Sequence, residues 1–339
     1  MTDAYNIAVV GATGAVGGVM LKLLAARRFP AASVRALAST GSAGLTVPYA
    51  GQELEVEELT EDSFSGIHIA LFSAGGARSR KFAPAAVASG AIAIDNSSAF
   101  RQEPNVPLVV PEVNPEDAKW HEGIIANPNC STIQMVVALK PVYNAVGIER
   151  IVVTTFQSVS GTGNKAIAEL FDQSEAMLES GEVDVNVYPH RIAFNVIPHI
   201  EHFHENGYTN EEVKMGNETR KIFGDPEIGV SATCVRVPVY NAHSESINIR
   251  TTRPISVEEV RRLMLSAPGV TLIDNPADNE YPMPVIAEGM DDVFVGRIRA
   301  DESAENSLNL WVVADNLRKG AATNAIQIAE LLVKDGLLE

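Results

Sequence analysis

Cysteine is scarce in this sequence, with only two residues among 339. Two thiols cannot build a disulfide framework, and no compact set of histidine, cysteine and carboxylate ligands occurs, so we expect no metal. Basic residues are also few: 26 lysines and arginines stand against 43 aspartates and glutamates, which gives a net charge of −17. Nucleic acids and anionic membranes bind basic faces, so neither is an expected partner.

The sequence also lacks the signals of an exported or membrane-bound protein. No run of 18 apolar residues occurs, and the first residues, MTDAYNIAVV, have neither a basic segment nor a cleavage site. We therefore expect a cytoplasmic protein. Hydrophobic residues make up 46% of the chain, which is enough to bury the cores of two domains at this length.

The N-terminal part predicts a parallel, doubly wound α/β sheet of the Rossmann-like kind. Short apolar strands alternate there with amphipathic helices, an order typical of βαβ units. Strands are expected at residues 5–10, 34–38, 67–72 and 91–95, with helices after the first strand and at residues 78–88.

The middle part differs, because its apolar and polar residues alternate over longer segments. Such alternation is typical of a mostly antiparallel sheet covered by helices on one face. We therefore predict a dinucleotide domain at residues 1–128 plus 316–339 and an inserted α+β domain at residues 129–315. Strands are expected at residues 150–158, 230–237, 244–252, 293–299 and 308–313, and helices at residues 166–178, 210–223 and 257–265 are expected to cover one side of their sheet. A last helix at residues 321–332 is expected to return to the first domain.

A glycine-rich loop follows the first strand, with Gly11, Gly14 and Gly17 in a G-x-x-G-x-x-G spacing. Glycines there permit a tight turn and let the backbone approach a pyrophosphate at the helix N-terminus. Glycines can also serve a turn alone, but the strand-loop-helix context favours a dinucleotide site. The site is expected to comprise Gly11, Thr13, Gly14, Ala15, Val16 and Gly17.

The end of the second predicted strand bears on the choice of coenzyme. NAD-binding folds place an acidic residue there for the ribose 2′-hydroxyl, whereas this sequence has Ser39, Thr40, Gly41 and Ser42. Hydroxyl and backbone N–H donors suit a 2′-phosphate better than a carboxylate would. We therefore predict NADP (NADPH) as the cofactor, held at Ser39, Gly41 and Ser42.

The two cysteines lie in different surroundings. Cys130, in the segment NPNCSTIQM, stands at the start of a predicted helix, where the helix dipole lowers the pKa of a thiol. Free cysteines are commonly buried core residues, so local chemistry alone leaves Cys130 open between that role and a nucleophile. Cys234 lies mid-strand among apolar residues and is expected to be structural.

Several longer motifs occur together and in order. With them the chain strongly resembles bacterial-type aspartate-semialdehyde dehydrogenases over nearly its whole length. The motifs are GATGAVG at residues 11–17, DNSSAFR at 95–101, NCSTIQM at 129–135, QSVSG at 157–161, AHSES at 242–246 and DNLRKGAA at 315–322.

The resemblance implies an enzyme that converts L-aspartyl 4-phosphate and NADPH into L-aspartate 4-semialdehyde, NADP and phosphate through a cysteine thioester. The product would feed the synthesis of lysine and diaminopimelate, methionine and threonine. The expected partners are thus a small-molecule substrate and phosphate. The resemblance also implies a homodimer formed through the inserted catalytic domain, with a tetramer as the alternative.

The same resemblance assigns roles to single residues. Cys130 is implied to be the thioester nucleophile, Gln157 to orient the substrate and His243 to transfer the proton. Arg236 is implied to bind the substrate α-carboxylate, although an arginine on a strand more often faces solvent.

Substrate amine and phosphate receive charged partners in this resemblance. Glu212 is implied to face the amine, and Arg101 and Lys214 to bind the phosphate. Ser160, Gly161 and Asn316 are placed near the nicotinamide end of the cofactor.

The sequence departs from the family at Gly41, where relatives often carry an arginine beside the serines that hold the 2′-phosphate. The preference for NADP is therefore expected to be weaker by one charge. Two other functions stay open: a reductase of N-acetylglutamyl phosphate with the same architecture, and a catalytically silent paralogue that serves as a binding or assembly protein. A silent paralogue would be expected to lose the nucleophile or its partners.

Overall fold

The computed structural model describes residues 4–179 and 181–338, which form two compact units. The first unit comprises residues up to 129 together with residues 321 onward, and the second comprises residues 130–320. Residues 1–3 and 339, which end the predicted first domain, lie outside the described residues.

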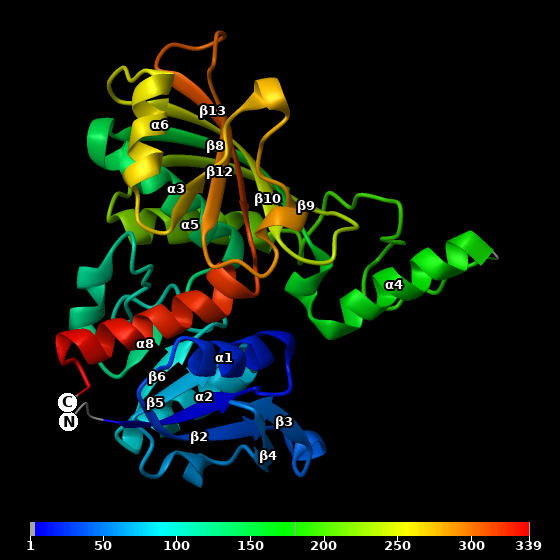
Figure 1. Cartoon of the computed structure of the whole chain (residues 1–339), viewed down its shortest axis with the longest axis vertical. Helices are drawn as coiled ribbons and strands as arrows, with labels where there is room; N and C mark the ends of the chain where they lie inside the picture. The colour runs from blue at the N-terminus through cyan, green and yellow to red at the C-terminus, as the bar shows by residue number, and fades with distance from the viewer. Residues whose placement is uncertain (1–3, 180, 339) are drawn as a thin grey trace. The chain divides into compact units, whose positions relative to one another are not determined.

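The first unit is built on a seven-stranded sheet with the order β3-β4-β2-β1-β5-β6-β7. All neighbouring strands are parallel except β3 and β4, so the predicted doubly wound fold is confirmed (Figure 1). The strands are β1 (Tyr5–Val10), β2 (Ala31–Ala38), β3 (Thr46–Tyr49), β4 (Gln52–Glu58), β5 (Ile69–Phe72), β6 (Ile92–Asp95) and β7 (Ile124–Ala126); the helices are α1 (Ala15–Ala26), α2 (Gly76–Ala88) and α8 (Thr323–Asp335).

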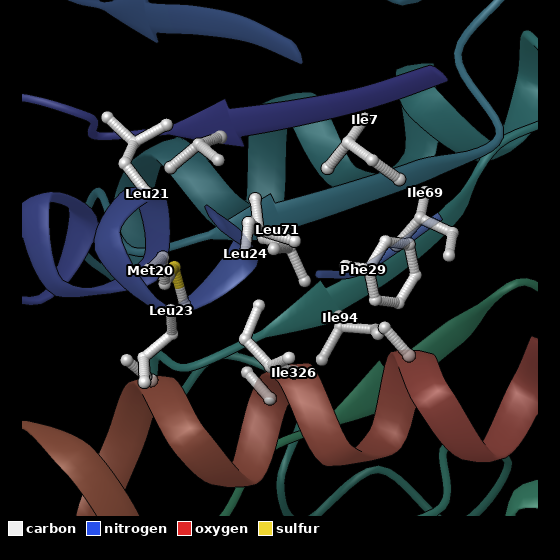
Figure 2. Packing of buried hydrophobic residues seen from close by; sticks show 14 of the residues in the cluster. Ile7, Met20, Leu21, Leu23, Leu24, Phe29, Ile69, Leu71, Ile94 and Ile326 are labelled. Atoms are coloured by element: carbon white, nitrogen blue, oxygen red, sulfur yellow. The ribbon is translucent and has the colours of Figure 1, made fainter. Parts of the chain in front are cut away.

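One of the two hydrophobic cores of this unit lies between the sheet and the helices α1 and α8, and the other involves residues of α2. Leu23 and Leu24 of α1 and Ile326 of α8 meet Ile7 and Leu71 of the sheet, and all five are buried (Figure 2). The C-terminal helix therefore completes the hydrophobic core of the first unit, although the second unit separates the two in sequence.

The loop between β1 and α1 depends on two glycines. Gly11 has a φ of +88°, and a Cβ atom there would lie 2.4 Å from the carbonyl oxygen of Ser73. A Cβ atom on Gly17 would lie 2.1 Å from the carbonyl oxygen of Gly11. Only glycine fits at either position, because the clash is with backbone that cannot move aside.

The second unit is a six-stranded sheet with the order β11-β12-β13-β10-β8-β9. Its central pairs are antiparallel, and the outer pairs β11/β12 and β8/β9 are parallel, which confirms a mostly antiparallel sheet. The strands are β8 (Ile148–Gln157), β9 (Gly229–Arg236), β10 (His243–Thr251), β11 (Val270–Leu272), β12 (Val293–Ala300) and β13 (Ser307–Ala314); the helices are α3 (Cys130–Val146), α4 (Asn164–Glu179), α5 (Asn210–Phe223), α6 (Val257–Ser266) and α7 (Pro284–Ala287).

Three helices of this unit, α3, α5 and α6, pack against the sheet (Figure 1). The helices expected at residues 210–223 and 257–265 therefore cover it as predicted, whereas the prediction that the helix at residues 166–178 also covers the sheet is wrong. Helix α4 extends away from it and carries its own small apolar cluster around Leu170 and Ile197. Within the described part of the chain, no helix has the length and apolar character needed to cross a bilayer. Residues 4–179 and 181–338 also hold no cluster of three or more metal-ligating side chains.

The glycine loop generates a stability test. In Gly17→Ala the new methyl group meets the backbone of Gly11, and overpacking of this kind lowers the free energy of unfolding by about 1–3 kcal/mol. Gly18→Ala, one residue later in the same helix, has no atom within 4 Å of the new Cβ. This variant should raise the free energy of unfolding by about 0.5–1 kcal/mol. Urea unfolding of both variants measures the difference, and equal midpoints would refute the packing argument.

Candidate active site

Strand register brings three predicted site residues to one edge of the second sheet. β8 runs parallel to β9 with Gln157 opposite Arg236, and antiparallel to β10 with Glu245 opposite Thr155. Gln157 and Arg236 are the last residues of their strands, and His243 is the first of β10. Because residues at alternate positions share a face, the side chains of all three lie on the buried face of the sheet, at the end where these strands meet.

His243 is held in one protonation state by its neighbours. The backbone N–H of Ser158 donates to its Nδ1 at 3.1 Å, so Nδ1 is an acceptor and the neutral ring carries its proton on Nε2. Complete burial and, to a smaller extent, the nearby guanidinium of Arg236 lower the pKa of His243 to about 3. Among the described residues, Nε2 has no hydrogen-bond partner, which leaves one N–H group available to a bound molecule.

Asn316 fixes the loop that carries Ser158. Its Oδ1 accepts hydrogen bonds from the hydroxyl of Ser158 at 3.0 Å and from the backbone N–H of Ala242 at 3.0 Å, and its Nδ2 donates to Ser160. Gly161 follows, and a Cβ atom there would lie 3.3 Å from the ring of His243 and 3.1 Å from Arg236. Ser160, Gly161 and Asn316 thus lie beside His243.

Cys130 is the first residue of α3 and is partly exposed. The backbone of Gly320 packs directly against it, because a Cβ atom on Gly320 would lie 2.8 Å from the Cβ of Cys130 and 3.6 Å from that of Asn316. The start of α3 is therefore packed next to the residue that orders the loop beside His243. Cys130 is thus linked to the cluster through Gly320 and Asn316.

Arg236 is buried rather than solvent-facing. It is 5% exposed, its Nη1 donates to the carbonyl oxygen of Ser158 at 2.6 Å, and its guanidinium lies 5.8 Å from the ring centre of Tyr188. Its Nε has no partner among the described residues. A buried guanidinium without a carboxylate partner is suited to bind an anionic group of a substrate.

Glu211, not Glu212, faces this cluster. The carboxylate of Glu211 accepts from Gln157 Nε2 at 3.1 Å and lies 3.3 Å from Lys214 Nζ. Glu212 points elsewhere: it accepts from the backbone N–H groups of Thr209 and Cys234 at 2.7 and 2.9 Å. The structure therefore does not place Glu212 at the site, because both its oxygens are used to hold the start of α5 against β9.

The sequence itself distinguishes the structural Glu212 from Glu211. Thr209-Asn210-Glu211-Glu212 has the T-x-x-E spacing of a capping box, which assigns Glu212 to the helix start. Glu211 and Lys214 are three residues apart and so share one helix face. Ser158 has no comparable signal, since its role depends on backbone groups that any residue would offer.

Two further buried groups stay neutral beside the site. Burial raises the pKa of the Cys234 thiol, in keeping with its predicted structural role. Burial also raises the pKa of Glu245 well above its usual range, and neither carboxyl oxygen has a partner within hydrogen-bond geometry among the described residues. Glu245 is therefore a neutral acid on the face that carries His243.

The first unit holds a separate pocket of about 240 Å³ at the carboxyl ends of β1 and β2. Gly11, Thr13, Gly14 and Ser39 are among the predicted cofactor residues that line it. Ala15, Val16 and Gly17 form the first turn of α1, and Gly41 and Ser42 belong to a 3₁₀ turn, Thr40–Ser42; these five are not part of the lining.

Arg101 also belongs to the first unit and is nearly buried. Its guanidinium donates to the carbonyl oxygens of Asn127 and Asn96 at 2.9 and 2.7 Å, and so braces the loop that precedes Cys130. Lys214 belongs to the second unit, where it pairs with Glu201 and Glu211. The structure thus gives both cations a protein partner.

The chain matches two family descriptions. Residues 6–121 match the NAD-binding domain of semialdehyde dehydrogenases, and residues 139–319 match the semialdehyde dehydrogenase dimerisation domain. Proteins named aspartate-semialdehyde dehydrogenase from Aquifex aeolicus and Legionella pneumophila are 58% and 54% identical to it. These alignments cover 98% and 100% of this chain, and 99% of each relative.

Solved structures of aspartate-semialdehyde dehydrogenases are also similar to this chain. Aspartate semialdehyde dehydrogenase II from Vibrio cholerae, complexed with ASA, has a TM-score of 0.96 at 51% identity, over 98% of this chain and 99% of that one. The enzyme from Candida albicans, solved with NADP, has a TM-score of 0.78 at 27% identity, over 99% of this chain and 100% of that one.

The surroundings of His243 generate a prediction about pH. The ring should remain neutral from about pH 8 down to about pH 5, because its folded-state pKa of about 3 lies below the unfolded value of 6.5. As the pH falls from 6.5 towards 3, only the unfolded chain takes up this proton, so His243 lowers stability over that range. Long-range ¹H–¹⁵N NMR spectra, assigned with His243→Asn, measure the titration; a midpoint near 6.5 would contradict the burial argument.

Proposed function

The chain belongs to the aspartate-semialdehyde dehydrogenase family, and we propose that it reduces L-aspartyl 4-phosphate to L-aspartate 4-semialdehyde with NADPH, through a thioester on Cys130. The observation that supports this most is the cluster of Gln157, Arg236 and His243 at the ends of their strands, to which the start of α3 is linked through Gly320 and Asn316. The family places the enzyme in the aspartate pathway. We propose that its product serves lysine, diaminopimelate, methionine and threonine synthesis.

The substrate carries three charged groups, and the site offers a partner for each. The buried guanidinium of Arg236 matches the α-carboxylate, which can take two parallel hydrogen bonds. The carboxylate of Glu211 matches the ammonium group, with Gln157 beside it. We assign the phosphate to Lys214 and Arg101, which would each exchange a present protein partner for the anion. Such local positive charge can bind an anion even though the net charge of the protein is −17.

The proposed chemistry begins at Cys130. Its thiolate attacks the acyl carbon of aspartyl phosphate, a tetrahedral intermediate forms, and phosphate leaves as the thioester closes. NADPH, when bound, supplies a hydride to the thioester carbon. The resulting thiohemiacetal releases the aldehyde and regenerates the Cys130 thiolate. The covalent step holds the acyl group in place for reduction, which turns one difficult transfer into two easier ones.

His243 stabilises the oxyanion in this scheme. Hydride addition places negative charge on the former carbonyl oxygen, and the Nε2–H of the neutral ring is the hydrogen-bond donor available to it. The thiohemiacetal anion then collapses to the aldehyde and expels the Cys130 thiolate, so the ring stays neutral and no proton is left over. The Ser158 N–H keeps Nδ1 in the acceptor state throughout, so Nε2–H is the group that the ring offers to the substrate.

The pocket of the first unit has a lining that suits part of a dinucleotide. Its lining combines the Gly11 turn, where a side chain would fill the space against Ser73, with the hydroxyls of Thr13 and Ser39. The N-terminus of α1 begins at Ala15 beside it, and such a terminus favours a pyrophosphate. We propose that NADP binds there, and that Ser160, Gly161 and Asn316 of the second unit contact its nicotinamide end.

Glu211 also favours this substrate over N-acetylglutamyl phosphate. Acetylation removes the positive charge from the substrate nitrogen, so the carboxylate of Glu211 would lose its proposed ion pair with the substrate. The retained cluster argues against a silent paralogue.

We propose further that the dimerisation-domain match reflects a homodimer, with the sheet face around the exposed Ser246 and the half-exposed Trp311 as its surface.

The reverse reaction tests the function and the nucleophile together. Wild-type protein should reduce NADP⁺ with aspartate semialdehyde only when phosphate is present. Cys130→Ala should fold normally and lose at least about a thousandfold in kcat, because it lacks the attacking sulfur. Cys234→Ala, the matched control, should retain turnover. If Cys130→Ala keeps a tenth of wild-type activity, the thioester route is wrong.

The adjacent pair Glu211 and Glu212 separates binding from structure. Glu211→Gln removes the charge that faces the ammonium group, and we expect a loss of about 2–5 kcal/mol in transition-state binding, measured as kcat/KM for aspartate semialdehyde. Glu212→Gln leaves one backbone N–H unpaired and should cost about 1–3 kcal/mol of stability with kcat/KM unchanged. The reverse pattern would return the substrate role to Glu212.

A further inference from the structure

A cation lines the dinucleotide pocket without a carboxylate partner. Arg78 shares the lining with Ser39, Thr13 and Gly11, and its Nη1 donates to the carbonyl oxygen of Ala74 at 3.3 Å. This bond directs the side chain back over the loop that follows β5. Among the described residues no acidic side chain forms an ion pair with Arg78.

Several other basic residues of the same unit are paired with carboxylates. Arg27 and Arg35 form ion pairs with Glu330 and Glu57, and Lys81 lies 3.9 Å from Glu61. Arg78 differs also in its place, because it stands in the first turn of α2, where the helix dipole opposes a positive charge. Neither the fold nor a neighbouring carboxylate accounts for an arginine here, whereas a bound anion would.

The surrounding charge shows why the pocket needs a cation. Glu58 lies at the end of β4 opposite Ala38, and its carboxylate accepts a hydrogen bond from the hydroxyl of Thr40. The N–H of Ser42 is used within the 3₁₀ turn, where it donates to the carbonyl oxygen of Ser39. Gly41, where the family resemblance leads one to expect an arginine, contributes no charge. A 2′-phosphate at Ser39 would therefore meet a nearby carboxylate and few free donors.

We propose that Arg78 is the residue that recognises the 2′-phosphate of NADPH, in place of the arginine that is missing at Gly41. This inference rests on the proposed function for the identity of the coenzyme. Arg78 reaches the pocket from α2, on the wall formed by the β5 loop, rather than from the turn after β2. Its guanidinium offers several donors and a charge to the phosphate, and charge-assisted bonds are about twice as strong as neutral ones.

Titration calorimetry with NADP⁺ and NAD⁺ tests the proposal without turnover. Arg78→Ala should weaken NADP⁺ binding by about 10- to 100-fold, the value of one hydrogen bond to a charged group, and leave NAD⁺ binding within about twofold. The loss should shrink at high salt, because Arg78 is exposed. Lys81→Ala, which removes the same charge from the same helix, is the matched control and should change neither affinity.

A second variant restores the positive charge at residue 41 instead of residue 78. The Cβ position of Gly41 has no atom within 4 Å, so Gly41→Arg has room, and combined with Arg78→Ala it should recover most of the NADP⁺ affinity. If Arg78→Ala weakens NADP⁺ and NAD⁺ equally, or weakens neither, the assignment is overturned. Wild-type protein that binds NADP⁺ through Arg78 but shows no phosphate-dependent turnover would instead refute the proposed function and keep the assignment.

Discussion

Ser158 holds the active site of the second unit together through all three of its polar groups. Its N–H donates to His243, its carbonyl oxygen accepts from Arg236, and its hydroxyl bonds Asn316. The guanidinium of Arg236 and the ring of His243 are therefore both positioned by one backbone segment at the end of β8. Because two of these bonds use the main chain, the arrangement follows from strand register more than from the identity of residue 158.

Burial determines how these groups behave. His243, Arg236 and Gln157 are each at most 5% exposed, so water cannot compensate any change in their charge. The site responds by keeping His243 neutral and by leaving polar atoms of His243 and Arg236 without protein partners among the described residues. Such unpaired buried atoms cost free energy in the empty site, and a substrate with complementary charges removes that cost on binding.

Much of the fold could be predicted from the sequence. Glycines at residues 11, 14 and 17 and the apolar strands mark the first sheet because each signal is local. β3 and β4 are not predicted, because β3 is only four residues long and contains a proline, and the largely exposed, acid-rich β4 resembles a loop. For the site, period-2 alternation showed that Arg236 points away from its apolar neighbours, but not which face the helices cover. That depends on α3 and α5, which pack from distant sequence.

The central claim is that the acyl group is carried on Cys130, and trapping that intermediate tests it most directly. Protein incubated with aspartate semialdehyde and NADP⁺ in the absence of phosphate should accumulate a thioester, since phosphate is needed to release the acyl group from the sulfur. Intact-mass and peptide mass spectrometry after acid quench should find one aspartyl group, on the peptide that contains Cys130. An adduct absent altogether, or located on Cys234 instead, would contradict the account.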